Sequence, residues 1–258
     1  MGRRPLYCAL GCCALLGCHD QVVGAFSSSG SGGSGGGTTA VTVTSENTDT
    51  SSGPDASSSA ANTGEDGPFV GCFSDEFDDE MIDTELWNPF ADAGAALEEV
   101  DGTLLLTPAP SGLAYSGVTL GFAYRYQLER GWVRATLLSS LAAADPVNVY
   151  LRAGEDDGAN YTVRVGGGTL SVTAPDETGA DVQEDHPEFG DAQAIGIRGD
   201  GNTIVFEASQ DGELWQTIAT RPATLAVERT KLLLMLETVG DGTGVAPVAV
   251  ERIEACAE

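Results

Sequence analysis

Apolar and polar residues alternate along much of the chain, and this pattern constrains the fold more than any other feature of the sequence. Tyr161, Val163 and Val165 fall on one face of their segment, while Thr162 and Arg164 fall on the other. A period of two is that of a β-strand, and the helical spacing of apolar residues is hard to find. The pattern therefore predicts an all-β domain.

Turn signals separate these alternating segments. Asp-Gly pairs begin at residues 101, 157, 200, 211 and 241, and they supply the positive-φ positions that hairpin turns require. Many short strands joined by such turns favour an antiparallel β-sandwich. The predicted strands are 104–107, 131–138, 147–152, 160–165, 170–173, 194–198, 203–209, 215–220, 231–238 and 248–255.

The N-terminus has the features of an export signal. Arg3 and Arg4 precede a short apolar run that ends in a small residue and Cys18, and this run is too short to span a bilayer. The ending Leu-Leu-Gly-Cys resembles the lipobox of bacterial lipoproteins, which implies a signal peptide over 1–17 and a lipid on Cys18. An ordinary secretory signal is the alternative, and Cys12 is a weaker acceptor.

Residues 18–68 follow, and they are rich in Gly, Ser and Thr without apolar periodicity. This composition cannot bury enough apolar surface to offset its ordering entropy, so a disordered, flexible tether is expected. Residues 69–258 are long enough for one β-sandwich domain. The domain should therefore be held at the cell envelope by a lipid anchor alone. The outer membrane is favoured because His19 follows Cys18, at the position where an aspartate retains some lipoproteins at the inner membrane.

Only two cysteines lie in the predicted domain, Cys72 near its start and Cys256 near its end. Outside the cytoplasm such a pair indicates a disulfide. Closing so long a loop would stabilise the fold by about 4–5 kcal/mol in the chain-entropy model. It also predicts that the first and last strands are neighbours.

Charge excludes some partners. The chain has 39 acidic and 12 basic residues, a net charge of −27. A surface this acidic repels nucleic acid and anionic lipid, so neither is expected as a partner. Divalent cations, basic partners and a saline environment remain compatible with it.

The domain resembles a known family. Asp75, Phe77 and the later Trp87 look like the opening of concanavalin A-like and laminin G-like jelly rolls, and the segments 194–204 and 209–215 are similar to their hairpins. The resemblance covers nearly all of 69–258. It implies two curved antiparallel sheets whose concave face, or edge loops, bind carbohydrate or protein.

On this basis the main hypothesis is a non-catalytic, monomeric jelly-roll domain that binds glycan or another extracellular polymer. Tyr150, Arg152 and Arg164 are the candidate ligand-binding residues, because alternation directs them away from the core. Glu155, Asp156, Asp157 and Asn160 are the candidate metal ligands, since hard oxygen ligands clustered in a loop suit calcium.

Two alternatives stay open. Hydrolases of the same superfamily carry a Glu-x-Asp-x-(x)-Glu strand whose two glutamates act as nucleophile and general acid, and Glu76 and Glu80 satisfy the shorter version. Their position at the start of the domain differs from the central concave strand of those enzymes. The other alternative is a protein-interaction scaffold that takes no small ligand.

Overall fold

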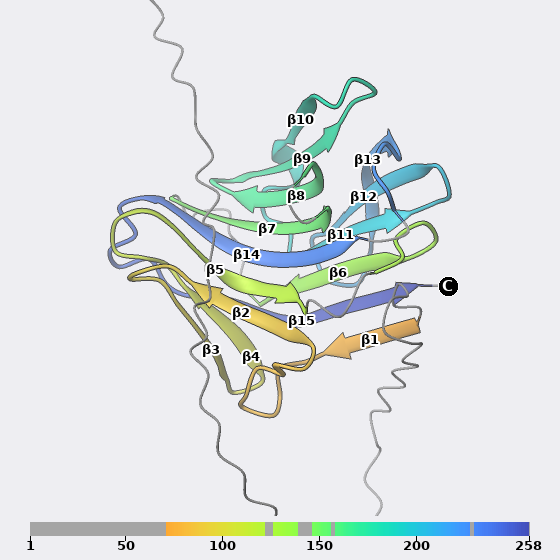
Figure 1. Ribbon diagram of the computed structural model, residues 1–258. Helices are drawn as coiled ribbons and strands as arrows, with labels where there is room; N and C mark the ends of the chain where they lie inside the picture. Colours follow the sequence, from red (N-terminus) through yellow and green to blue (C-terminus); the bar gives the residue numbers. More distant parts are fainter. Residues whose placement is uncertain (1–70, 122–125, 139–145, 156–157, 228–229, 258) are drawn as a thin grey trace, which may run out of the picture. The chain divides into compact units, whose positions relative to one another are not determined.

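The computed structural model describes residues 71–121, 126–138, 146–155, 158–227 and 230–257. The described chain forms an antiparallel sandwich of two curved sheets, which confirms the predicted all-β jelly-roll fold (Figure 1). The predicted signal peptide and tether lie outside the described residues. Among those residues, no helix has the length and apolar character needed to cross a membrane.

One sheet, called here the β14 sheet, has the strand order β10-β9-β8-β7-β14-β5-β2. The other, the β15 sheet, has the order β13-β12-β11-β6-β15-β4-β3, with β1 also paired to β15. The elements are β1 (Gly71–Asp75), β2 (Trp87–Ala91), β3 (Ala96–Val100), β4 (Thr103–Thr107), β5 (Gly112–Leu120), β6 (Trp132–Leu137), β7 (Val147–Gly154), β8 (Asn160–Gly166), β9 (Thr169–Pro175), β10 (Asp181–His186), the 3-10 helix η1 (Pro187–Phe189), β11 (Ala194–Gly199), β12 (Thr203–Ser209), β13 (Gln216–Pro222), β14 (Lys231–Gly240) and β15 (Val248–Ala257).

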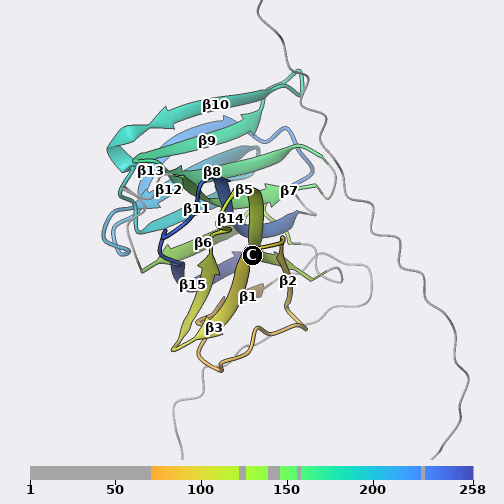
Figure 2. The same ribbon diagram turned by 90° about the vertical axis from the view of Figure 1, so that its left-hand side faces the viewer.

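The core lies between the two sheets, where β11 packs against β7 and β8 (Figure 2). Tyr161, Val163 and Val165, which alternation groups on one face, are fully buried, and Val149 and Leu151 on the neighbouring β7 are almost fully buried. Their neighbours Arg152 and Arg164 point to the outer face, as a period of two requires. Alternation therefore assigned the two faces of these strands correctly.

Five strands, β1, β2, β3, β5 and β10, are absent from the predicted ranges. β10 has the sequence DVQEDH, and its first five residues are exposed because it is an edge strand paired only with β9. Apolar alternation is absent where neither face is covered, so periodicity could not find it. β5 contains several small residues, among them Gly117, which sits against the backbone of β14.

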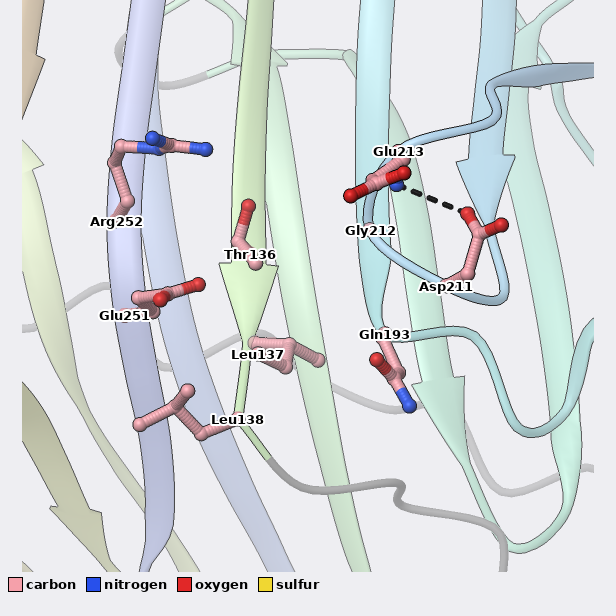
Figure 3. Close-up of a pocket in the computed structure, with 9 residues that line it drawn as sticks. All are labelled: Thr136, Leu137, Leu138, Gln193, Asp211, Gly212, Glu213, Glu251 and Arg252. Carbon is pink, nitrogen blue, oxygen red and sulfur yellow. Dashed lines mark hydrogen bonds between the residues drawn. The ribbon is translucent and has the colours of Figure 1, made fainter.

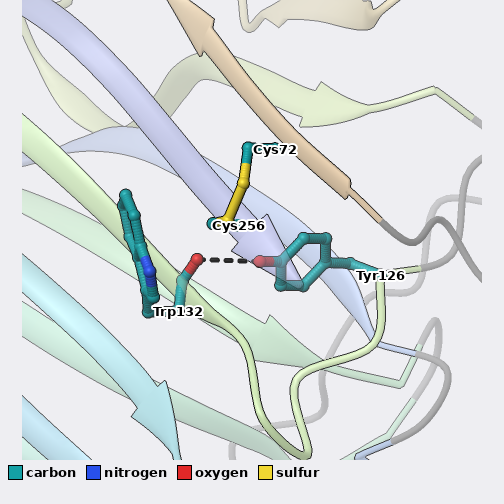
Figure 4. Close-up of a disulfide and its surroundings, with 4 residues drawn as sticks. All are labelled: Cys72, Tyr126, Trp132 and Cys256. Carbon is teal, nitrogen blue, oxygen red and sulfur yellow. Dashed lines mark hydrogen bonds between the residues drawn. A yellow bond between two sulfur atoms is a disulfide. The ribbon is translucent and has the colours of Figure 1, made fainter. Parts of the chain in front are cut away.

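The two ends of the domain are joined as predicted. β1 pairs with β15, and Cys72 lies directly opposite Cys256, to which it is disulfide-bonded (Figure 4). Beside this bond, the Tyr126 hydroxyl donates a hydrogen bond of 2.9 Å to the backbone oxygen of Trp132. The disulfide thus closes a loop between residues 184 positions apart in the sequence.

A buried acidic group fixes the segment after β1. The Asp75 carboxylate accepts hydrogen bonds from the indole of Trp87 (2.6 Å) and from the backbone of Phe77 (3.0 Å). The Glu99 carboxylate accepts the backbone N–H of Asp79 at 3.2 Å and is only 8% exposed. Burial, together with the carboxylates of Asp79 and Asp75, raises the pKa of Glu99 to about 7 from its ordinary 4.5.

This raised pKa predicts a pH-dependent stability. Between about pH 4.5 and pH 7 the folded protein holds a proton at Glu99 that the unfolded chain has released. The contribution of Glu99 to the free energy of unfolding should therefore be largest below pH 4.5 and should fall as the pH rises to 7. Thermal unfolding at pH 5 and pH 8 should show a smaller drop in Tm for Glu99→Gln than for the unmodified protein. The exposed neighbour Glu98→Gln is the matched control, and equal drops in all three proteins would contradict the prediction.

Candidate functional site

Polar side chains gather on the outer face of the β14 sheet. Strand register places Met235, Tyr150, Arg164, Ser171 and Asp185 side by side across neighbouring strands. The next row along the strands contains Tyr115, Glu237 and Asn148. The centre of this polar surface lies around Glu237. We use the name Glu237 face for seven residues there: Asp92, Tyr115, Asn148, Tyr150, Arg152, Arg164 and Glu237.

Glu237 is the central carboxylate of this face. It lies on β14, between β5 and β7, and one of its oxygens accepts hydrogen bonds from the Tyr150 hydroxyl and from the Asn148 amide, the latter at 3.0 Å. Its register partner on β5 is Tyr115, whose hydroxyl also interacts with it. Three polar side chains from two flanking strands therefore orient a single carboxylate.

The two tyrosines are hydrogen-bond donors to Glu237 and keep their protons. Burial, followed by the hydrogen bond and the negative charge of Glu237, raises the pKa of Tyr150 to about 12. Burial and then the Glu237 charge also raise the pKa of Tyr115, although the Arg152 guanidinium opposes this. Both phenols are thus protonated at neutral pH. This arrangement leaves Glu237 as the acceptor in both contacts.

A second carboxylate flanks Tyr115 on the side away from Glu237. The backbone N–H of Asp92 donates to the Tyr115 carbonyl (2.8 Å), and the Asp92 carboxylate accepts the Tyr115 N–H (3.0 Å). Asp92 therefore continues the pairing of β2 with β5. Neighbouring strands lie 4.7–4.9 Å apart, which puts the Cα atoms of Asp92 and Glu237 roughly 10 Å apart.

Arginines complete the face. The Arg152 guanidinium lies over the Tyr150 ring, 4.9 Å from its centroid. Arg164 donates to Ser171 Oγ (3.0 Å), and the Ser171 hydroxyl donates to Asp185 (2.7 Å). This relay, with Gln183, lowers the pKa of Asp185. The face therefore combines a carboxylate centre with cationic groups one or two strands away.

The three predicted ligand-binding residues are brought together by β7 and β8. Arg152 and Arg164 point outward as expected, and their role in binding stays a prediction. Tyr150, however, is only 8% exposed, because Arg152 covers its ring and its hydroxyl is bound to Glu237. Direct stacking of this ring on a sugar does not fit that burial, whereas orienting Glu237 does.

The predicted metal loop is described in part. Asp156 and Asp157 lie outside the described residues, and Asn160 donates its amide to the Gly158 carbonyl at 2.8 Å. The Glu155 backbone N–H bonds to the Ala159 carbonyl at 3.5 Å. No group of three metal-ligating side chains occurs among the residues that the structure describes. A calcium ion at this loop stays a prediction.

Glu76 and Glu80 lie in the loop after β1. Because β1 ends at Asp75, neither glutamate is on a strand, and Glu80 has a positive φ of 63°. The Glu76 carboxylate is exposed and lies 4.0 Å from Arg252 of the β15 sheet. The hydrolase motif requires both carboxylates on one side of a strand, so this local structure does not match it.

A pocket of about 260 Å³ lies on the β15 sheet, near the end of β6 (Figure 3). A β-bulge between Val250 and Arg252 turns both Glu251 and Arg252 toward it, across from the hairpin loop that carries Asp211. Asp211 accepts the backbone N–H groups of Glu213 and Leu214, and these bonds lower its pKa. Asp211 therefore serves as a turn cap, and the Glu237 face is the stronger candidate site.

Glu237, Tyr115, Asn148 and Asp92 were not identified from the sequence. Glu237 carried a usable signal, since it is the one acidic residue within the apolar run 232–239 of a predicted strand. Asn148 alternates with the buried Val147 and Val149, but nothing in the sequence pairs it with Glu237. Tyr115 and Asp92 lie in and beside strands that were not predicted.

The sequence matches no family model, and it matches no curated protein. Solved structures of similar fold include a prokaryotic β-1,3-1,4-glucanase (lichenase) derived from a mouse hindgut metagenome, 10% identical over 73% of this chain and 100% of that chain, with a TM-score of 0.50. SCLam, a non-specific endo-β-1,3(4)-glucanase from family GH16, is 9% identical over 71% of this chain and 89% of its own (TM-score 0.53). The Crh5 transglycosylase is 11% identical over 75% and 87% (TM-score 0.51).

These neighbours confirm the resemblance to concanavalin A-like jelly rolls. They contradict the prediction that the domain is not an enzyme, because the proteins that share its fold are glucanases and a transglycosylase. At 9–11% identity the similarity shows the fold. Because fold alone does not fix a reaction, the chemistry depends on this chain's own residues.

Proposed function

We propose that this chain is a glycoside hydrolase that cleaves a polysaccharide lying across the Glu237 face. The observation that carries the proposal is the central Glu237 carboxylate, oriented by Tyr150 and Asn148 on the outer face of the sheet. The fold shared with two glucanases and a transglycosylase supports the same class of reaction.

Glycoside hydrolysis requires two carboxyl groups, one that protonates the leaving oxygen and one that acts as base or nucleophile. Glu237 suits the second role, because its hydrogen-bond partners are donors that fix its position without neutralising its charge. Asp92 is the other carboxylate of the face, and it lies across Tyr115. Their Cα atoms are roughly 10 Å apart, and the side chains can bring the carboxyl groups to either the 6.5–9.5 Å of inverting or the 5–5.5 Å of retaining enzymes.

The proposal is tested by incubating the purified full-length chain with a panel of β-linked polysaccharides and measuring the release of reducing ends. Proton NMR of the first products gives their anomeric configuration and shows whether cleavage retains or inverts it. Each assay is repeated with calcium and with chelator, and loss of activity in chelator would support the predicted calcium site. No cleavage of any polysaccharide would overturn the proposal.

The proposal also places this activity at the cell envelope, in the outer membrane, with the domain held by a lipid on Cys18. The charged and apolar segment before Cys18 and the Gly/Ser/Thr-rich composition of 18–68 support it. Metabolic labelling with an alkyne fatty acid should mark the expressed chain. Cys18→Ala should abolish the label and Cys12→Ala should keep it, whereas the opposite pattern would place the lipid on Cys12.

A further inference from the structure

Four of the seven arginines that the structure describes pair with carboxylates. On the β15 sheet, Arg134 and Arg198 both pair with Glu207 (3.0 and 3.2 Å), and Arg252 pairs with Glu254 at 3.3 Å. Arg221, on β13, bonds to Glu184. In a chain of net charge −27, carboxylate partners are the expected arrangement. Of the other three arginines, Arg130 is exposed on a loop, whereas Arg152 and Arg164 lie on the Glu237 face.

Arg152 departs from that arrangement. Among the described residues, no carboxylate lies within ion-pair distance of its guanidinium. Its buried Nε has no hydrogen-bond partner, as is also true of Arg134 and Arg252, but those two arginines have carboxylates beside them. Its contact is the Tyr150 ring, at 4.9 Å. Arg164 likewise bonds to neutral oxygens, the hydroxyls of Ser171 and Tyr150, and forms no direct ion pair within the described chain.

The two arginines lie close to each other and to Tyr150, which bonds to Glu237. Arg152 is opposite Thr162 on β8, and Arg164 is opposite Tyr150 on β7, so the arginines are diagonal neighbours with Cα atoms about 7–8 Å apart. Tyr150 lies between them and bonds to Glu237. Two cations without carboxylate partners therefore contact Tyr150, the residue that orients Glu237.

We infer that the polysaccharide bears anionic substituents, the carboxylates of uronic acids or sulfate esters, and that Arg152 binds one of them with Arg164 beside it. This inference rests on the proposed function and names its substrate class. An oxyanion would supply the charge-assisted hydrogen bonds that Arg152 lacks within the described chain. A neutral glucan would leave the Arg152 guanidinium without such a partner.

The acidic surface sets the conditions of the test. The net charge of −27 repels a polyanion at low ionic strength. At 0.15 M salt the screening length is about 8 Å, so the contact between Arg152 and the substituent dominates over the distant charges. Binding and cleavage are therefore measured at or above this salt concentration.

The experiment compares an acidic polysaccharide with its own neutral form. The full-length chain is given polyuronates and their carboxyl-reduced derivatives, and sulfated galactans and their desulfated derivatives, and both binding and reducing-end release are recorded. The anionic form should be preferred by at least about 10-fold. Arg152→Met, which keeps an apolar stem over Tyr150, should reduce that preference by about 10- to 100-fold, the effect of losing a charged hydrogen bond.

Arg130→Met, at an exposed position on the loop before β6, is the matched control and should keep the preference. Arg164→Met provides a second variant if Arg152→Met does not fold. Cleavage of neutral forms without preference would overturn the inference and leave the hydrolase assignment standing. Preferential binding of the anionic forms without cleavage would overturn the hydrolase assignment and support the inference. Absence of both binding and cleavage would overturn both.

Discussion

Glu237→Gln should lower the rate of polysaccharide cleavage by about 100- to 10,000-fold, the contribution of one acid–base group. Glutamine keeps the shape of the side chain, and its carbonyl oxygen can still accept the hydrogen bond from Tyr150. It carries no charge and cannot take up a proton, so the chemistry is removed while the packing is kept. The measurement is kcat/KM from reducing-end release, with circular dichroism to show that the variant is folded.

Two comparisons make this result specific. Glu177→Gln, in the exposed turn after β9, should leave the rate unchanged. Glu76→Gln and Glu80→Gln should also leave it unchanged, because both residues lie in the loop after β1. Full activity in Glu237→Gln, together with its loss in Glu76→Gln or Glu80→Gln, would contradict our assignment and locate the chemistry in that loop.

Removing the disulfide should be the largest single loss of stability. In the chain-entropy model, a bond that joins residues 184 positions apart contributes about 4–5 kcal/mol by restricting the unfolded chain. The paired Cys72→Ser and Cys256→Ser substitutions should lower Tm by about 10–20 °C, since 1 kcal/mol corresponds to about 2–4 °C for a domain of this size. Differential scanning calorimetry measures the shift.

Reduction provides the independent control for this prediction. Dithiothreitol should lower the Tm of the unmodified protein toward that of the double variant and should leave the variant unaffected. Cys18→Ser, which lies outside the domain, should leave Tm unchanged. An unmodified protein whose Tm equals that of the double variant under oxidising conditions would contradict the stabilising role of the bond.

Local sequence was sufficient for the strands that bury one face. Val149 and Leu151 alternate with Tyr150 and Arg152 on β7, and this period assigned the inner and outer faces correctly. The spacing of Asp-Gly pairs located hairpin turns, as at Gly102 and Gly201, both of which have positive φ. Alternation failed at β10, because an edge strand with exposed residues carries no apolar pattern.

The sequence by itself determined which side chains leave the core, and only the tertiary structure decided which of them meet. Glu237 and Tyr150 are 87 residues apart, and they make contact because β14 is inserted between β5 and β7. Periodicity is a property of one strand, whereas strand order depends on the packing of the whole sandwich. For that reason the sequence was enough to identify Arg152 and Arg164 as candidates. The contact of Glu237 with Tyr150 and Tyr115 became visible only in the folded sheet.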